Sequence, residues 1–315
     1  MKVVALAGGV GGAKLANGLS KILPAEDLTV IVNTGDDFIF HGLNVSPDVD
    51  TVLYTLAGIN NPVTGWGRIG ETWNTLEEFR RLIGEEWFNV GDKDLALHLT
   101  RTRQLREGKT LTEVTRYLCS KLGVNIQILP MTNSPVRTKI LTDSSGLLDF
   151  QEYFVKFKFE PEIKGIFFDG IENAEITLEI SSALSSAELV VICPSNPFVS
   201  IQPILSVPDM VDLVRNKPCL AVSPIIKGNA IKGPAAKMFR ELGHHPGPES
   251  IAEFYEGIIN GLIYDSLDAD LQCDFHRWGI IPLQADTVMV DETTQKSLAE
   301  VVVQFGRNLI KDFST

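Results

Sequence analysis

The sequence predicts an α/β protein, with a Rossmann-like parallel sheet flanked by helices and a small β-rich insert. Two observations support this fold class. Short apolar runs of the kind that is buried on both faces of a parallel sheet alternate with helical patterns along most of the chain. Between residues 136 and 180, apolar and polar residues instead alternate around a Ser-Ser-Gly turn, which is typical of an antiparallel hairpin. We therefore expect a core formed by residues 1–135 and 181–315, with the insert at 136–180.

The predicted core begins with a strand–turn–helix–strand unit. Its first strand, residues 2–9, ends in glycine, and the helical pattern that follows is ended by Pro24. A second apolar strand follows at residues 28–37. Ser46 is expected to cap the next helix, which has Pro47 at its first position. The remaining predicted elements are a mainly helical stretch at 71–122, buried strands at 125–130, 187–197, 217–226 and 287–291, and an amphipathic helix at 294–313.

The composition excludes some classes of partner. The chain has 315 residues, of which 44% are hydrophobic, and a formal net charge of −12. Such an acidic surface repels phosphate backbones and anionic lipids, so neither nucleic acid nor a membrane is an expected partner. The cysteines show no C-x-x-C spacing and predict reduced, buried thiols. Without a signal peptide or an apolar run of membrane length, we expect a cytoplasmic protein. The four cysteines are Cys119, Cys193, Cys219 and Cys273.

A glycine-rich turn, LAGGVGGAKLANGL at residues 6–19, joins the first strand to the first helix. Glycines at this position let the backbone approach an anion and direct N–H groups at it, with a helix N-terminus behind. The turn therefore predicts a phosphate-binding site, with a purely structural turn as the alternative. The third glycine of the dinucleotide fingerprint and the second glycine of a P-loop are both missing. The candidate residues are Gly9, Gly11, Gly12 and Lys14.

Four acidic residues fall near one another after the second strand. Asp36 and Asp37 lie in the polar turn that ends this strand, and Asp48 and Asp50 lie at the start of the next predicted helix. Oxygen ligands suit Mg²⁺, which bridges carboxylates and substrate phosphates. Turn formation and helix capping are the alternative roles for these residues.

Two further loops follow predicted strands. Because ligands bind outside the carboxyl ends of the strands in open parallel sheets, polar residues in these loops are candidates for binding. The first loop offers Ser195 and Asn196. The second offers Lys232 and Gly233, which would suit a diphosphate, with a solvated basic turn as the alternative.

Large aromatic residues lie beside polar loops. They predict either ordinary core packing or a flat apolar wall for an aromatic ligand, with Asn89 among its polar groups. His98 lies in an apolar helical run and is expected to be a core residue rather than a ligand. The aromatic residues are Trp66, Trp73, Trp87 and Phe88.

Taken together, these segments resemble the 2-phospho-L-lactate transferase family, which acts in the biosynthesis of the deazaflavin coenzyme F-420. The resemblance covers nearly the whole chain and rests on the combination GGVGGAKL, VNTGDD, SPDVDTVLYTLAG, WGRIGETW, WFNVGDKDLALHL, LPMTNSPVRT, CPSNPFVSI and KGPA. It implies a transferase that moves a 2-phospholactyl or phosphoenolpyruvyl group from a guanosine diphosphate conjugate. The implied acceptor is the ribityl hydroxyl of 7,8-didemethyl-8-hydroxy-5-deazariboflavin (Fo). GMP leaves, and Mg²⁺ is required. The acid carried by the donor stays open among lactate, enolpyruvate and glycerate.

The resemblance also implies roles for individual residues. Asp50, Asn89 and Trp87 are expected to bind Fo, within a helical region at about residues 45–122. Asp50 is the first choice of catalytic residue, which orients or deprotonates the ribityl hydroxyl, or else only holds metal or acceptor. A homodimer is expected. The implied metal ligands are Asp36, Asp37 and Asp50, and the implied donor-binding residues are Gly9, Gly11, Gly12, Lys14, Ser195, Asn196, Lys232 and Gly233.

Two other classes of protein remain as alternatives. The first is a non-catalytic regulator of a related family, which uses a similar glycine turn to sense nucleotide sugars. The segments SPDVDT and WFNVGDKD argue against it, because a sensor would not need an acceptor site. The second is an NAD-dependent oxidoreductase. Asn33 and Thr34 argue against it, because they end the second strand where a dehydrogenase has an acid for the ribose.

Overall fold

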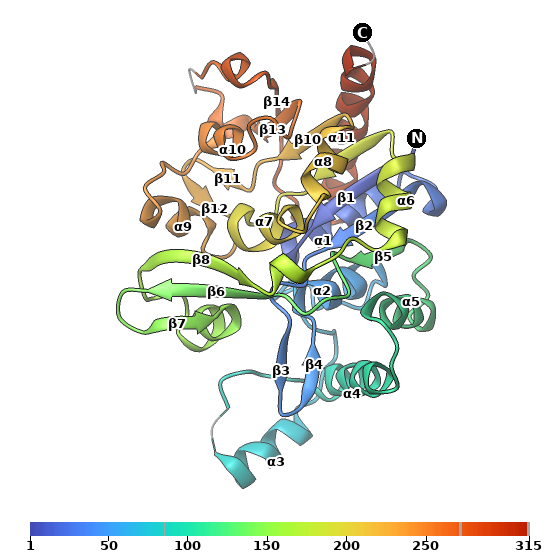
Figure 1. Cartoon of the computed structure of the whole chain (residues 1–315), viewed down its shortest axis with the longest axis vertical. Helices are drawn as coiled ribbons and strands as arrows, with labels where there is room; N and C mark the ends of the chain where they lie inside the picture. Colours follow the sequence, from blue (N-terminus) through green and yellow to red (C-terminus); the bar gives the residue numbers. More distant parts are fainter. Residues whose placement is uncertain (85, 271–272, 314–315) are drawn as a thin grey trace.

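The computed structural model describes residues 1–84, 86–270 and 273–313 and confirms the predicted fold class. Within these residues, the centre is a sheet of seven strands in the order β14-β13-β10-β9-β1-β2-β5 (Figure 1). Each neighbouring pair is parallel, so all seven carboxyl ends lie at one edge of the sheet. The strands are β1 (Val3–Ala7), β2 (Leu28–Val32), β5 (Gln127–Pro130), β9 (Leu189–Ile192), β10 (Cys219–Val222), β13 (Gly261–Asp265) and β14 (Ile281–Ala285).

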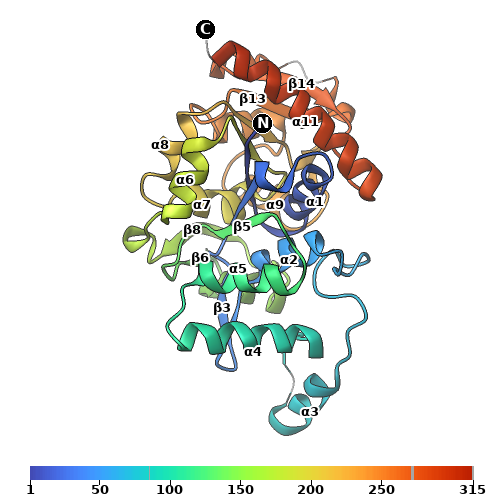
Figure 2. The same cartoon turned by 90° about the vertical axis from the view of Figure 1, so that its right-hand side faces the viewer.

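Strand β1 shows why the apolar runs form central strands. Val3 and Ala5 point into one hydrophobic cluster and Val4 and Leu6 into another, since successive side chains of a strand point to opposite faces. Figure 2 shows helices on both sides of the sheet. The first cluster is packed by α1 (Gly9–Ser20), α2 (Pro47–Leu56), α5 (Leu111–Lys121) and α11 (Glu292–Phe313). The second is packed by α6 (Leu178–Ser186), α7 (Gln202–Leu205), α8 (Met210–Arg215), α9 (Ala235–Glu241) and α10 (Pro248–Phe254).

A group of elements extends beyond the carboxyl edge of the sheet, at the opposite end of the molecule from α11 (Figures 1 and 2). This group contains a short antiparallel hairpin, which the sequence does not predict, and the helices expected between residues 71 and 122. The hairpin consists of β3 (Phe38–Phe40) and β4 (Leu43–Val45), and the helices are α3 (Asn74–Ile83) and α4 (Asp92–Arg106), followed by α5.

Ser46 stands at the predicted N-cap position of α2, and Pro47 is the first helical residue. The Ser46 hydroxyl does not cap the helix, however. It donates a hydrogen bond of 2.7 Å to Oδ2 of Asp37. Ser46 therefore ties the start of α2 to the loop that follows β2.

The predicted antiparallel hairpin is present, and a third strand extends it. The strands lie in the order β7-β6-β8, formed by β6 (Arg137–Thr142), β7 (Gly146–Asp149) and β8 (Ile163–Asp169). This small sheet packs against the second hydrophobic cluster through Ile140 and Ile163. The division into a core and an insert at residues 136 and 180 stays a prediction.

The last part of the sheet differs from the sequence prediction. Residues 287–291, expected as the final strand, form a loop, and the sheet ends with β13 and β14. Val288 and Val290 are exposed, whereas Met289 between them packs into the first hydrophobic cluster, so this stretch is buried on one side rather than on both. Strand β14 accommodates Pro282 because an edge strand has one unpaired side. Helix α1 also ends at Ser20, before the predicted stop.

The prediction of free, buried thiols is confirmed for three of the four cysteines, whereas Cys273 is partly exposed. Cys119, Cys193, Cys219 and Cys273 are free, and the first three are buried. Burial raises the pKa of each of these thiols, which keeps them protonated and unreactive. Within the described ranges, no helix is long and apolar enough to cross a lipid bilayer.

Candidate functional site

A cavity of about 720 Å³ opens at the carboxyl edge of the sheet. Its volume falls within the range of small-molecule binding sites. The lining comes from the loops that follow β1, β9, β10 and β14, together with α2, α4 and residues 64–67. Most of the predicted site residues line this cavity: Gly9, Gly11, Lys14, Asp36, Asp50, Asn89, Ser195, Asn196, Lys232 and Gly233.

Three predicted site residues lie outside the cavity lining. A Cβ atom at Gly12 would come within 2.5 Å of the Ser195 hydroxyl, so this glycine serves close packing. Asp37 is buried behind the lining, where it accepts the hydrogen bond from Ser46. Trp87 packs into a cluster of aromatic rings with the β3–β4 hairpin.

Of the aromatic residues predicted as a ligand wall, Trp66 and Phe88 line the cavity and Trp87 does not; Tyr54, Phe150 and Phe154 line it as well. Trp66 is half exposed, so its ring is available at the cavity mouth. His98 is buried, as the sequence predicts, but it also lines the cavity. The predicted core position of His98 is therefore confirmed, and the prediction that it is not a ligand stays a prediction.

The glycine-rich turn places the start of α1 at the cavity. Gly9 has φ +62°, a left-handed conformation that glycine adopts without strain. A Cβ atom at Gly11 would lie 2.1 Å from the carbonyl oxygen of Pro194. The Ser195 hydroxyl donates to the Gly8 carbonyl oxygen at 2.7 Å and accepts from the Gly8 N–H at 3.1 Å. The glycines thus let the loop after β9 pack closely on the N-terminus of α1, whose first residues face the cavity.

Two lysines approach the cavity from different elements. Nζ of Lys14, on α1, donates a hydrogen bond of 2.5 Å to the Met289 carbonyl oxygen. Nζ of Lys232, in the loop before α9, donates a hydrogen bond of 2.6 Å to the Thr64 carbonyl oxygen. Burial lowers the pKa of Lys14, and the nearby positive charge of Lys232 lowers it further. Two cations held this close together favour an anion of more than one negative charge between them.

Asp36 and Asp48 form a buried acidic pair at the cavity. Burial raises the pKa of Asp36 well above its ordinary value, and the charge of Asp48 raises it further. Burial also raises the pKa of Asp48 to about 6, although Asn33 opposes this by donating a 2.9 Å hydrogen bond to its Oδ2. Oδ1 of Asp36 is buried and accepts no hydrogen bond from the described residues. Two crowded carboxylates with an unused oxygen fit a divalent cation.

The predicted metal ligands Asp36, Asp37 and Asp50 do not converge on one point. In the part of the chain that the structure describes, no three His, Cys, Asp or Glu side chains are grouped so that they could hold a metal ion. The carboxylate of Asp37 is directed to Ser46, and that of Asp50 is directed to Arg101.

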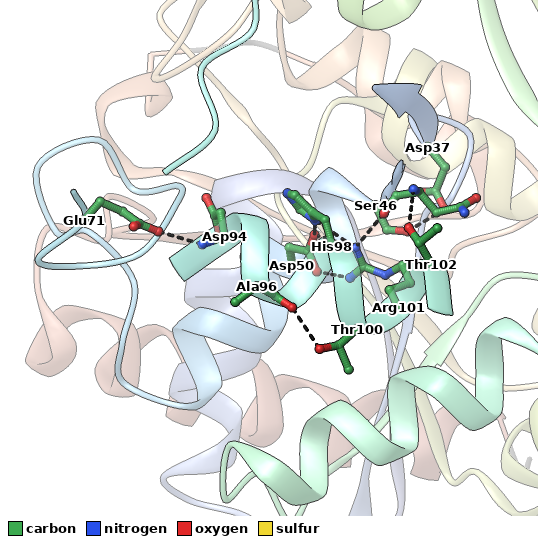
Figure 3. Close-up of polar contacts among 11 residues, drawn as sticks. Asp37, Ser46, Asp50, Glu71, Asp94, Ala96, His98, Thr100, Arg101 and Thr102 are labelled. Carbon is green, nitrogen blue, oxygen red and sulfur yellow. Dashed lines mark hydrogen bonds and ion pairs between the residues drawn. The ribbon is translucent and has the colours of Figure 1, made fainter. Parts of the chain in front are cut away.

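Asp50 takes part in a buried ion pair (Figure 3). Arg101, on α4, is fully buried and donates from Nη1 to Oδ2 of Asp50 at 3.1 Å and from Nη2 to Oδ1. Nη1 of Arg101 also lies 3.2 Å from Nδ1 of His98. Burial lowers the pKa of His98 to about 4, so the imidazole is neutral and its Nδ1 accepts from the arginine. The carboxylate of Asp50 is thereby fixed at the wall of the cavity.

Sequence reasoning missed Arg101 and the cavity position of His98. It did place Asp48 near Asp36 as a possible oxygen ligand, although Asp48 is not among the metal ligands that the resemblance implies. The sequence contains one indication of Arg101, which is its spacing of three residues from His98 within the same predicted helical run. That spacing shows that the two side chains share a face, but it does not show that Asp50 lies opposite.

Comparison with known proteins identifies relatives over the full length. The family model described as 2-phospho-L-lactate transferase CofD matches residues 3–304. The 2-phospho-L-lactate transferase of Methanosarcina mazei is 37% identical over 302 residues, which covers 96% of this chain and 99% of that protein. The phosphoenolpyruvate transferase of Streptomyces griseus is 35% identical over 316 residues, covering 98% of this chain and 99% of that protein.

A solved structure shares the fold. A member of the upf0052 family from Bacillus halodurans superposes with a TM-score of 0.63 at 16% identity, covering 96% of this chain and 98% of that chain. At this identity the likeness concerns the fold alone. The match of the family model over nearly the whole chain, together with relatives above 30% identity, decides the family. The chain belongs to the 2-phospho-L-lactate transferase (CofD) family and is an enzyme of coenzyme F-420 biosynthesis.

Proposed function

We propose that the enzyme transfers a 2-phospholactyl or phosphoenolpyruvyl group from a guanosine diphosphate conjugate to the terminal ribityl hydroxyl of Fo. The acceptor oxygen attacks the phosphorus that carries the lactyl or enolpyruvyl group. The bond from that phosphorus to the bridging oxygen of GMP breaks, and the hydroxyl proton is released. The observation that carries the proposal is one cavity with lysines at its glycine-rich side and a fixed carboxylate on its α2–α4 wall.

The donor diphosphate fits the glycine-rich side of the cavity. The N-terminus of α1 offers backbone N–H groups at Gly9 and Gly11, and Lys14 and Lys232 supply the positive charge. Catalysis of phosphoryl transfer consists mainly of positioning and electrostatic stabilisation, and it needs no nucleophile from the protein.

A magnesium ion fits Asp36 and Asp48 better than the three ligands expected from the sequence. Both line the cavity, and the unpartnered Oδ1 of Asp36 is free to coordinate a cation. Magnesium is commonly held by one or two carboxylates plus substrate phosphates. When bound there, the ion would neutralise the diphosphate and stabilise the departing phosphate.

Asp50 would orient the acceptor. Its carboxylate is held in position by the buried Arg101 and can accept a hydrogen bond from a hydroxyl group. Trp66 and Phe88 would form the apolar wall for the tricyclic ring, with Asn89 beside them. We therefore assign Asp50 an orienting role in the transfer.

The assembly and the location of the enzyme are also proposals. We propose a cytoplasmic homodimer that binds small-molecule substrates, with no nucleic acid or membrane partner. The free thiols support the location. The exposed apolar side chains Ile39, Leu82 and Ile83 on the β3–β4 hairpin and α3 support self-association. Light scattering of the purified protein should give twice the mass of one chain, and a monomer mass would contradict the dimer.

One assay tests the reaction. Purified protein with Fo, Mg²⁺ and a lactyl, enolpyruvyl or glyceryl donor should release GMP and form a phosphorylated deazaflavin, detected by mass spectrometry. Competition among the three donors in one mixture identifies the preferred acid. Chelation with EDTA should stop turnover, and an unchanged rate would refute the metal role. No product with any of the three donors would refute the proposed transfer.

A further inference from the structure

The carboxylate of Asp37 lies behind the cavity wall, between the loop that follows β2 and the start of α2. Its Oδ2 accepts the 2.7 Å hydrogen bond from the hydroxyl of Ser46, a residue that is only 1% exposed. The carbonyl oxygen of Ser46 in turn accepts a 2.9 Å hydrogen bond from the backbone N–H of Asp50. The side chain of Asp37 is therefore connected to the first turn of α2, which carries Asp50 at the cavity.

Arg101 connects Asp37 to Asp50 by a second route. Burial raises the pKa of Asp37 to about 7, and the hydrogen bond from Ser46 and the positive charges of Arg137 and Arg101 oppose this rise. Burial alone would lower the pKa of Arg101, but the negative charges of Asp50 and Asp37 raise it above its ordinary value. The fully buried guanidinium therefore interacts with two carboxylates, and it donates from both terminal nitrogens to one of them, Asp50.

These contacts form a closed ring around Asp50, and Figure 3 shows its four members together. From Asp37 the ring passes through Ser46 and one helical turn of backbone to Asp50. It returns from the carboxylate of Asp50 through the charge of Arg101 to Asp37. Ser46 holds the backbone of Asp50 and Arg101 holds its side chain, so both restraints on Asp50 involve Asp37.

An acid at position 37 needs a reason beyond the hydrogen bond from Ser46. An amide could accept that bond without the cost of burying a carboxylate. What the acid adds is a second attraction on Arg101, besides that of Asp50. The arginine is then held by two groups, and the carboxylate that it binds is fixed more firmly at the cavity wall. Such precision matters, because a displacement of about 1 Å at a reacting group can cost about a hundredfold in rate.

We infer that Asp37 is a positioning residue for the transfer, which holds Arg101 and the start of α2 and thereby orients the carboxylate of Asp50. This inference rests on the proposed function, in which Asp50 orients the acceptor hydroxyl. Asp37 itself lies outside the cavity lining and acts only through its neighbours. Its removal should therefore lower kcat and leave donor binding unchanged.

A double-mutant cycle tests this role with the full chain, Fo, Mg²⁺ and the preferred donor. Asp37→Ala should lower kcat by about tenfold, as expected for a lost contact to a charged group. The KM for the donor should change by less than about twofold. In the Asp50→Asn background, the same substitution should change kcat by less than about twofold, because the carboxylate that Asp37 positions has already been removed. A merely structural role would give equal losses in both backgrounds.

Two milder substitutions keep the test decisive if Asp37→Ala does not fold. Asp37→Asn keeps an oxygen that can accept from Ser46, so its kcat should lie between those of Asp37→Ala and the wild type. Ser46→Ala keeps the acid but removes the hydroxyl, and it should lower kcat by about threefold. Both effects should disappear in the Asp50→Asn background.

Asp27→Ala is the matched control. Asp27 also pairs with a positive group, the N-terminal amine at 3.0 Å, but it lies just before β2, at the opposite edge of the sheet from the cavity. Its kcat and its KM for the donor should equal those of the wild type.

The outcomes distinguish the positioning role from the proposed function. An unchanged kcat in Asp37→Ala would overturn the role, as would an equal loss in the Asp50→Asn background, which is the result expected if Asp37 acted through the neighbouring Asp36. Absence of turnover by the wild type would overturn the transfer itself. In that case melting temperatures still test the ring, because Asp37→Ala combined with Arg101→Met should lower the melting temperature by less than the sum of the two single losses. Additive losses would overturn the ring.

Discussion

At the scale of single residues, Arg101 determines the charge environment of Asp50. The guanidinium is completely buried, and both of its terminal nitrogens donate to the same carboxylate. Nη1 also lies 3.3 Å from the Asn44 carbonyl oxygen, so the arginine connects α4 to strand β4 as well. Asp50 can therefore present its carboxylate at the cavity wall although it lies in a buried environment.

Removing this arginine leaves a buried charge without its partner. We expect Arg101→Met to lower the free energy of unfolding by about 3–5 kcal/mol and to lower kcat with Fo. Arg103→Met on the same helix is the control, since Arg103 is exposed and its ion pair with Glu107 should contribute at most about 1 kcal/mol. Urea unfolding and initial rates check both variants. If Arg103→Met lost as much stability as Arg101→Met, this would contradict a special role for the buried ion pair between Arg101 and Asp50.

The buried acidic pair predicts a pH dependence of stability. The pKa of Asp48 rises from 3.8 to about 6 on folding, so between these pH values the folded state binds a proton that the unfolded state has lost. The free energy of unfolding therefore falls as the pH rises through this window. With EDTA present, the melting temperature of Asp48→Asn should exceed that of the wild type by a margin that grows from about pH 4.5 to about pH 7.

Asp212→Asn on α8 is the control for the loss of one carboxylate, because Asp212 is exposed. Its melting temperature should follow that of the wild type over the same pH range. If the difference in melting temperature between Asp48→Asn and the wild type stays constant or shrinks as the pH rises, burial does not raise the pKa of Asp48 in the folded protein.

At the scale of elements, the contact between α1 and the loop after β9 positions the glycine-rich side of the cavity, where we propose that the donor binds. This contact depends on Gly11, where any side chain would meet the backbone of Pro194. Backbone atoms cannot move aside as the end of a flexible side chain can. The start of α1 and the loop after β9 therefore hold each other at the distance that leaves the cavity open.

Gly11→Ala tests this arrangement. The new Cβ atom would lie 2.1 Å from the Pro194 carbonyl oxygen, so α1 and the loop must separate. We expect a loss of about 1–3 kcal/mol in the free energy of unfolding and a raised KM for the donor. Gly247→Ala is the control, because its Cβ atom would meet side-chain atoms rather than backbone, at 3.1 Å from Oε2 of Glu249 and 3.7 Å from Nδ1 of His245. If Gly11→Ala keeps the KM of the wild type, the contact does not position the donor.

At the scale of the whole molecule, the proposed function requires an acidic protein to bind a diphosphate. With a net charge of −12, long-range attraction cannot bring a diphosphate to the cavity. Binding must instead depend on a few cations at the site, and Lys14 and Lys232 are the ones that line it.

Lys14→Met should therefore raise the KM for the donor by about tenfold to a hundredfold, which corresponds to the loss of one charge-assisted hydrogen bond. The KM for Fo should stay unchanged. Lys21→Met is the control, because Lys21 lies at the other end of α1, where it is exposed and pairs with Glu292. Similar effects of the two substitutions would show that overall charge, rather than position, determines donor binding.

The sequence predicts the parts of this fold that depend on local patterns. The central strands are buried on both faces, so their apolar runs are visible in the chain. Strand β14 is half-buried and contains Pro282, so its pattern resembles a loop, whereas the exposed Val288 and Val290 in the true loop resemble a strand. The rule that ligands bind at the carboxyl ends of parallel strands correctly predicts that the loops after β1, β2, β9 and β10 surround the cavity.

The contacts between distant segments could not be predicted from one sequence. Arg101 lies 51 positions after Asp50, and only the packing of α4 against the start of α2 makes them partners. Trp66 and Trp87 have similar surroundings in the sequence, and the β3–β4 hairpin decides which of them packs internally. Membership in a transferase family decides against the sensor and the oxidoreductase, which local motifs alone leave open.

The hydrogen bond between Lys232 and the Thr64 carbonyl has a consequence for the order of substrate addition. It joins segments 168 positions apart across the mouth of the cavity, and Trp66 lies two residues after Thr64. A diphosphate that binds Lys232 competes with this carbonyl and releases the segment that carries the aromatic wall. We therefore expect the guanylated substrate to bind first and GMP to leave last. GMP would then inhibit competitively with respect to the guanylated substrate and noncompetitively with respect to the deazaflavin.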